Sequence, residues 1–132
     1  MFVEWTTRLS VGVEPMDAAH KRLIELMNRL HELCVDGEDR TEIRRALKAL
    51  SDFTVRHFRE EETYMESIRY PGLANHKHIH ASLIKQLGEH ASAFEAGTGP
   101  LPNGFFTFLE VWLTAHIMGI DGKYGEHART HA

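Results

Sequence analysis

Residues 41–67, TEIRRALKALSDFTVRHFREEETYMES, contain neither glycine nor proline. Apolar residues recur in this stretch every three or four positions, as expected for one face of a helix with about 3.6 residues per turn. Thr41 is placed to cap the first turn. The stretch therefore predicts a long amphipathic helix, with an apolar face formed by Ile43, Ala46, Leu47, Leu50, Phe53 and Phe58.

Three further helices and an N-terminal arm are predicted around this stretch. Apolar periodicity predicts helices over residues 17–36, 73–96 and 103–126. Asp17 is expected to cap the first of them. Residues 1–16 contain glycine and proline and are expected to be irregular. Helices joined by short loops pack antiparallel, so the sequence predicts an all-α fold: an up-down-up-down antiparallel four-helix bundle with an irregular N-terminal arm.

Length and composition limit the class of protein. A chain of 132 residues is the usual size of one domain, so residues 1–132 are expected to form a single domain. A net charge of -4 argues against nucleic acid as a partner, because phosphate binding needs clustered lysine and arginine. Neither a signal peptide nor an apolar run of membrane-spanning length is evident. With Cys34 as the only cysteine, a cytoplasmic protein without membrane insertion is expected.

Histidine is the unusual residue of this composition, with ten copies spread along the chain. His57 and Glu61 are four residues apart in one predicted helix, and His76 and His80 are four apart in the next. Residues at this spacing share a helix face, with Cβ atoms about 5–6 Å apart, close enough to share a metal. Candidate ligands from all four helices are His20, His57, Glu61, His76, His80, His116 and Asp121.

These candidates lie at the helix ends that an antiparallel bundle brings to one level, within roughly two turns at a rise of about 1.5 Å per residue. Five imidazoles and two bridging carboxylates offer more donor atoms than one octahedral metal can use. Two octahedral metals that also share an oxo or hydroxo group would keep one position open for a small ligand. Imidazole and carboxylate suit iron, although zinc, copper and manganese accept the same donors.

The site differs from that of ferritin-like di-iron bundles, which use a Glu-x-x-His motif on each of two helices. No histidine of this chain follows a glutamate by three residues. The predicted site is therefore rich in histidine and poor in carboxylate, which favours binding of O2 over oxidation chemistry.

Four segments carry short motifs in a fixed order. They are MDAAH (16–20), HFREE (57–61) followed by Glu62 and Met65, YPGLANHKHIH (70–80) and WLTAHIMGIDGKY (112–124). At this spacing they resemble the hemerythrin family, and specifically its bacterial branch, over nearly the whole chain. The related myohemerythrin is a four-helix bundle, so the resemblance implies the same fold.

The resemblance also implies how two iron ions would share the ligands. In the family, one iron takes three histidines, the other takes two and keeps the open position, and two carboxylates bridge. Matched to this sequence, the iron with three histidines would be bound by His76, His80 and His116. The iron with two histidines would be bound by His20 and His57, and the bridging carboxylates would be Glu61 and Asp121.

Reversible binding of O2, for carriage, storage or local delivery, is the function that the resemblance implies, with no net turnover. An O2 or redox sensor acting through a protein partner is an alternative. A peroxidase-like or NO-handling di-iron enzyme is a further one, ranked last because the sequence shows no cofactor-binding motif.

Apolar residues near the candidate ligands are expected to line a dry O2 pocket that slows the entry of water, although ordinary core packing would explain the same residues. They are Leu23, Phe58, Trp112, Leu113 and Ile117.

His116 and Asp121 are five residues apart, which is off-face for an ideal α-helix. The family resemblance favours a widened turn of the π-bulge kind near Gly119 over a surface location for Asp121. Glu60 and Glu62 are expected to belong to a solvated helix face. The remaining histidines are predicted to lie at the surface: His31, His78, His90, His127 and His131.

Overall fold

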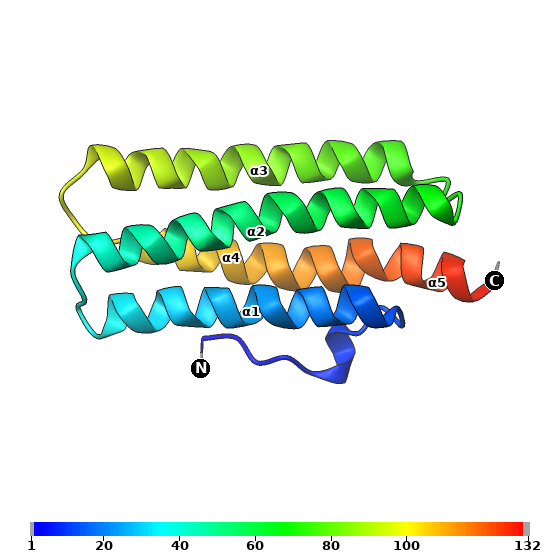
Figure 1. Cartoon of the computed structure of the whole chain (residues 1–132), viewed down its shortest axis with the longest axis horizontal. Helices are drawn as coiled ribbons and strands as arrows, with labels where there is room; N and C mark the ends of the chain where they lie inside the picture. Colours follow the sequence, from blue (N-terminus) through cyan, green and yellow to red (C-terminus); the bar gives the residue numbers. More distant parts are fainter. Residues whose placement is uncertain (1, 131–132) are drawn as a thin grey trace.

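The computed structural model describes residues 2–130, which form a bundle of long helices running side by side (Figure 1). The helices are α1 (Glu14–Val35), α2 (Arg40–Ser67), α3 (Leu73–Ala96), α4 (Asn103–Ala115) and α5 (Gly122–Thr130), with a 3-10 turn at Thr7–Leu9 and a π-helical segment at His116–Asp121. Successive long helices run in opposite directions, and α4, the π segment and α5 together form the fourth rod (Figure 1). The predicted up-down-up-down bundle is confirmed, and no strand occurs within residues 2–130.

The first helix begins at Glu14, three residues before the predicted start. Pro15 does not break the chain, because it lies in the first turn, where a missing N–H costs nothing. The prediction that Asp17 caps this helix was wrong. Its carboxylate instead accepts hydrogen bonds from Ser10 Oγ (2.6 Å) and from the backbone N–H of Val11 (2.8 Å), and so holds the arm against α1.

The N-cap of α2 is Asp39, whose side chain accepts a hydrogen bond from the backbone N–H of Glu42 at 3.0 Å. Thr41 therefore lies inside the first turn and is not the cap, although the helix begins within one residue of the predicted start. The bounds of α3 agree with the predicted range of 73–96.

The N-terminal arm is fixed to the bundle at both ends. Near its beginning, the side-chain amide of Asn28 donates to the carbonyl of Val3 and accepts from its N–H, both at 2.8 Å. Near its end, the carbonyl oxygen of Val11 lies where a side chain on Gly125 would begin, 2.0 Å from an ideal Cβ. A glycine is required at position 125 because the arm and α5 approach so closely.

The interior of the bundle has two parts of different chemistry. Towards the α1–α2 loop it is apolar, with side chains such as Met27, Leu50 and Leu109 fully buried. Towards the opposite end it contains a cluster of buried histidines and carboxylates, which would be unfavourable without compensating partners. No helix within residues 2–130 combines the length and apolar character needed to cross a bilayer.

Candidate metal centre

All seven predicted ligands come together in the polar part of the interior. One comes from α1, two from α2, two from α3 and two from the π segment, and each is no more than 5% exposed: His20, His57, Glu61, His76, His80, His116 and Asp121. Because the helices are antiparallel, residues near the start of α1 and α3 meet residues near the end of α2 and the fourth rod.

The π-helical segment explains how the unusual spacing on the fourth rod works. An extra residue per turn returns Asp121 to the face of His116, and Nε2 of His116 lies 3.0 Å from Oδ1 of Asp121. The predicted widened turn is therefore confirmed. Gly119 lies within it, but a Cβ there would meet nothing within 4 Å, so the turn does not arise from a steric need for glycine.

Glu61 is shared between histidines of three different helices. Its Oε2 lies 3.0 Å from Nε2 of His20. Its Oε1 lies 3.2 Å from Nε2 of His57 and 3.4 Å from Nε2 of His80. One carboxylate therefore faces the α1 and α2 histidines and also an α3 histidine.

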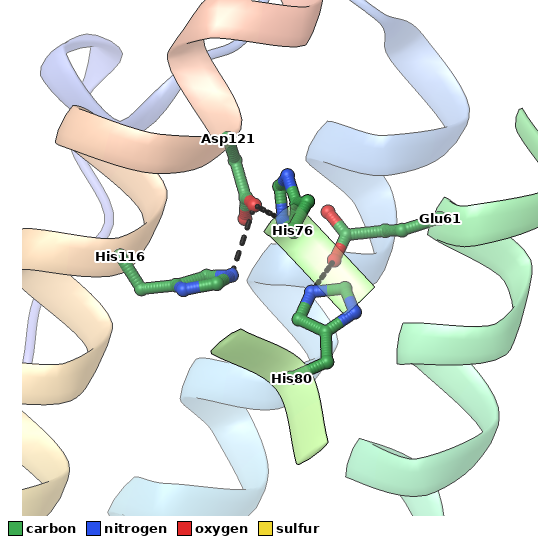
Figure 2. A group of neighbouring side chains, drawn as sticks. All are labelled: Glu61, His76, His80, His116 and Asp121. Carbon is green, nitrogen blue, oxygen red and sulfur yellow. Dashed lines mark ion pairs between the residues drawn. The ribbon is translucent and has the colours of Figure 1, made fainter. Parts of the chain in front are cut away.

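Asp121 has a similar position on the opposite side. Its Oδ1 lies 2.9 Å from Nε2 of His76 and 3.0 Å from Nε2 of His116 (Figure 2). Its Oδ2 lies 3.2 Å from Nε2 of His20. The two carboxylates thus lie between a set of three histidines and a set of two.

Two overlapping groups in this cluster have ligand atoms within 4.8 Å of one another. The first contains His76, His80, His116 and both carboxylates, and the second contains His20, His57 and Glu61. This division agrees with the partition that the family resemblance implies.

Spacing and hydrogen bonding in the cluster fit metal ions. Imidazole and carboxylate ligands about 2.1 Å from a metal would be about 3.0 Å apart at adjacent octahedral positions, since that distance is about √2 times the bond length. The N···O distances given above run from 2.9 to 3.4 Å. Most of these buried nitrogen and oxygen atoms also lack a well-oriented hydrogen-bond partner, Nε2 of His57, His76 and His116 among them. Lone pairs that converge in this way are stabilised by a cation.

The carboxylates and His20 of the cluster shift one another's pKa strongly. Burial raises the pKa of Glu61, but its close contacts with His20, His57 and His80 outweigh burial and hold that pKa well below its usual range. Burial and the charge on Glu61 oppose ionisation of Asp121, yet its histidine partners also lower its pKa. Burial lowers the pKa of His20, but Asp121 and Glu61 outweigh that effect and raise it to about 9. At neutral pH, His20 is therefore protonated without metal.

Tyr124 completes the surroundings of Glu61. Its hydroxyl donates a hydrogen bond of 2.6 Å to Oε2 of Glu61, and its side chain is fully buried. Burial, together with the charge on Glu61, raises the pKa of Tyr124, so the hydroxyl keeps its proton. The sequence included Tyr124 only as the end of a motif, and its spacing of three from Asp121 was the available signal for this role.

Glu62 was predicted to belong to a solvated face, and this prediction was wrong. Its Oε2 lies 2.9 Å from Nδ1 of His80, and its side chain is only 24% exposed. Glu60 is exposed, as predicted. Adjacent residues on a helix point about 100° apart, and this angle turns Glu62 towards α3 while Glu61 faces the interior.

All five residues predicted to line an O2 pocket are buried: Leu23, Phe58, Trp112, Leu113 and Ile117. Phe58 contacts the cluster directly, with its ring stacked on His80 at a centroid distance of 3.8 Å. Trp112 packs edge-on against Phe58 and also lines a shallow apolar hollow at the surface between α3 and α4.

Histidines outside the cluster differ from one another in burial. His78 is exposed, as predicted. His31, His90 and His127 are half-buried, which corrects the prediction of surface positions, because each packs against an aromatic ring: Phe2, Phe108 and Tyr70, respectively. His131 lies outside the described residues.

Comparisons with known proteins agree with this geometry. Residues 11–128 match the model of the Hemerythrin HHE cation binding domain. A bacteriohemerythrin of Stenotrophomonas maltophilia is 33% identical over 96% of this chain and 82% of its own length. A bacteriohemerythrin of Methylococcus capsulatus is 34% identical over 92% of each chain. A crystal structure of wild-type hemerythrin superposes with a TM-score of 0.88 at 32% identity, covering 96% of this chain and 97% of the other.

Proposed function

The chain belongs to the hemerythrin family, and we propose that it binds O2 reversibly at a pair of iron ions held by the seven clustered side chains. The observation that carries the proposal is the sharing of both carboxylates. Glu61 and Asp121 each lie within 3.4 Å of histidines from both sets. A carboxylate placed between two sets of nitrogen donors suits a bridge between two metals better than a ligand of one.

The distribution of histidines gives the two ions unequal surroundings. One would be held by His76, His80 and His116, and the other by His20 and His57, with Glu61 and Asp121 between them. The second ion has fewer protein ligands, so it is the one expected to accept a small molecule. When bound, the iron pair would supply the reversible exchange of electrons with O2 that the resemblance to this family implies.

The role of the protein is to hold the donors in place and keep water away. The phenol of Tyr124 fixes one oxygen of Glu61 through a hydrogen bond that persists at neutral pH. The buried side chains of Leu23, Leu113 and Ile117 follow or precede ligand residues by one turn or less, and we assign them to the wall of the O2 pocket. An apolar wall disfavours the entry of water and protons, which would otherwise favour irreversible oxidation.

Elemental analysis of protein purified from iron-replete cells tests the metal part of this proposal. We expect two irons per chain, because the cluster offers donors for two octahedral ions. A reproducible content near one metal per chain, or zinc in place of iron under these conditions, would contradict it.

A further inference from the structure

His80 differs from the other clustered histidines on the side facing away from the centre. Oε2 of Glu62 lies 2.9 Å from its Nδ1, while its Nε2 faces inward, 3.4 Å from Oε1 of Glu61. In the other four rings, Nδ1 is buried without a hydrogen-bond partner among the described residues: His20, His57, His76 and His116.

Two contacts together fix the orientation of the His80 ring. Its plane is parallel to that of Phe58, at an interplanar angle of 2° and a centroid distance of 3.8 Å. Stacking fixes the plane but allows a 180° flip about the Cβ–Cγ bond, which exchanges the positions of Nδ1 and Cδ2. The hydrogen bond to Glu62 removes that freedom, because only one orientation directs Nδ1 at the carboxylate.

The partner of Nδ1 also determines the position of the imidazole proton. A carboxylate accepts hydrogen bonds and a neutral imidazole has a single N–H, so Glu62 keeps the proton on Nδ1. The lone pair of Nε2 is then free to bind a metal. A carboxylate partner also makes the imidazole a stronger ligand.

We propose that Glu62 is a positioning residue of the metal centre, which aims Nε2 of His80 at the three-histidine metal and strengthens its binding. This inference rests on the proposed function, since it concerns the same site. A stronger donor favours the ferric over the ferrous ion, so Glu62 lowers the reduction potential of the iron pair. The effect acts at the three-histidine metal, because among the clustered histidines only His80 has a carboxylate partner for Nδ1 within residues 2–130.

Cobalt(II) provides a test that does not depend on iron or O2. Metal-free wild type, Glu62→Ala, Glu62→Gln and Glu60→Ala are loaded with Co2+, and the loss of its visible bands to excess EDTA is followed. We expect one of the two Co2+ ions to be lost about 10- to 100-fold faster from Glu62→Ala. Glu62→Gln should lie between it and wild type, because the amide oxygen still accepts the hydrogen bond but carries no charge. The exposed neighbour Glu60 is the matched control, and its variant should behave like wild type.

Potentiometric titration of the iron-loaded proteins adds a readout that a purely structural role would not change. We expect a positive shift of the midpoint potential in Glu62→Ala and a smaller positive shift in Glu62→Gln, with none in Glu60→Ala. Circular dichroism establishes that each variant is folded, and the nearly isosteric Glu62→Gln remains informative if the alanine variant unfolds.

The proposal is overturned if the folded Glu62 variants release Co2+ at the rate of Glu60→Ala and show the wild-type potential. Failure of the proposed function has a different signature. A wild type that binds two Co2+ ions but does not bind O2 reversibly refutes the O2 proposal, and the cobalt comparison still decides the role of Glu62.

Discussion

Glu61, like Asp121, contacts histidines of both sets. It lies within 3.4 Å of histidines from α1, α2 and α3 and accepts the hydrogen bond of Tyr124, all without exposure to solvent. Its neighbour Glu60 is exposed. The pair therefore offers a sharp comparison between a buried shared carboxylate and a solvated one.

Replacing Glu61 by Ala should cause the loss of at least one iron and destabilise the protein by about 3–5 kcal/mol, because it leaves buried cationic partners without their counter-charge. Glu60→Ala should change the free energy of unfolding by no more than about 0.5 kcal/mol. Iron analysis and thermal unfolding of both variants measure these effects. Similar losses of iron and stability in the two variants would show that Glu60 and Glu61 are assigned to the wrong faces of α2.

The stability of the metal-free protein should depend on pH in two opposite ways. The pKa of Glu61 and of Asp121 is lowered by folding, so their contribution is present above their ordinary values of 4.5 and 3.8 and disappears as the pH falls. The pKa of His20 is raised by folding, so its contribution is complete below 6.5 and disappears as the pH rises through about 9.

Urea unfolding of the metal-free protein should therefore show greatest stability between about pH 5 and 7, with losses on both sides. The His20→Gln variant serves as a control, since it should lose the decline above pH 7. If the wild type keeps full stability up to pH 9, the assigned protonation of His20 is incorrect.

Spacing along the sequence and the family resemblance together identified all seven clustered residues. Pairs four apart on a helix and helix ends at one level follow from regular geometry, whereas the off-face spacing of Asp121 needed the resemblance. Spacing could not identify the role of Glu62, which depends on how closely α2 approaches α3. The same holds for Tyr124, whose hydrogen bond to Glu61 joins residues 63 positions apart. Contacts of this kind are set by packing, which periodicity does not describe.

Helix boundaries were predicted less well than the helices themselves. Asp17 was expected to cap α1, but the same carboxylate holds Ser10 and Val11 of the arm. Pro15 was read as a breaker, although proline suits the first turn of a helix. In each case the residue type was compatible with two local structures. Tertiary contacts with the arm decided the role of Asp17.

The π-helical segment allows a prediction about the effect of deleting one residue from it. A turn of this kind corresponds to an α-helix with one inserted residue. Deleting Gly119, which is exposed and has no neighbour within 4 Å of its Cβ position, should restore an ordinary α-helix. His116 and Asp121 would then be four residues apart and still on one face. We expect this variant to retain two irons per chain by elemental analysis.

Deletion of His78 is the matched control, since this exposed residue also lies between two clustered ligands. The α3 helix has no extra residue to lose, so the deletion should rotate His80 by about 100° relative to His76 and reduce the iron content. Equal iron contents in the two deletion variants would contradict this account of the π segment.

The bundle keeps most of its apolar core apart from the polar cluster of histidines and carboxylates. Apolar side chains fill the end near the α1–α2 loop, and the seven clustered histidines and carboxylates lie towards the opposite end. The antiparallel arrangement brings the ligands together from four separate parts of the chain. This arrangement could be predicted because four amphipathic segments with short connections leave few alternative ways to bury their apolar faces.

We propose that this cluster holds iron so that O2 binds and leaves without being consumed. The most direct test of this proposal is the optical spectrum of the anaerobically reduced, iron-loaded protein, recorded before air, after air and after removal of O2. We predict that a colourless protein becomes coloured in air and bleaches again when O2 is removed, over repeated cycles. Immediate irreversible oxidation on the first exposure, with stoichiometric release of peroxide, would contradict the account.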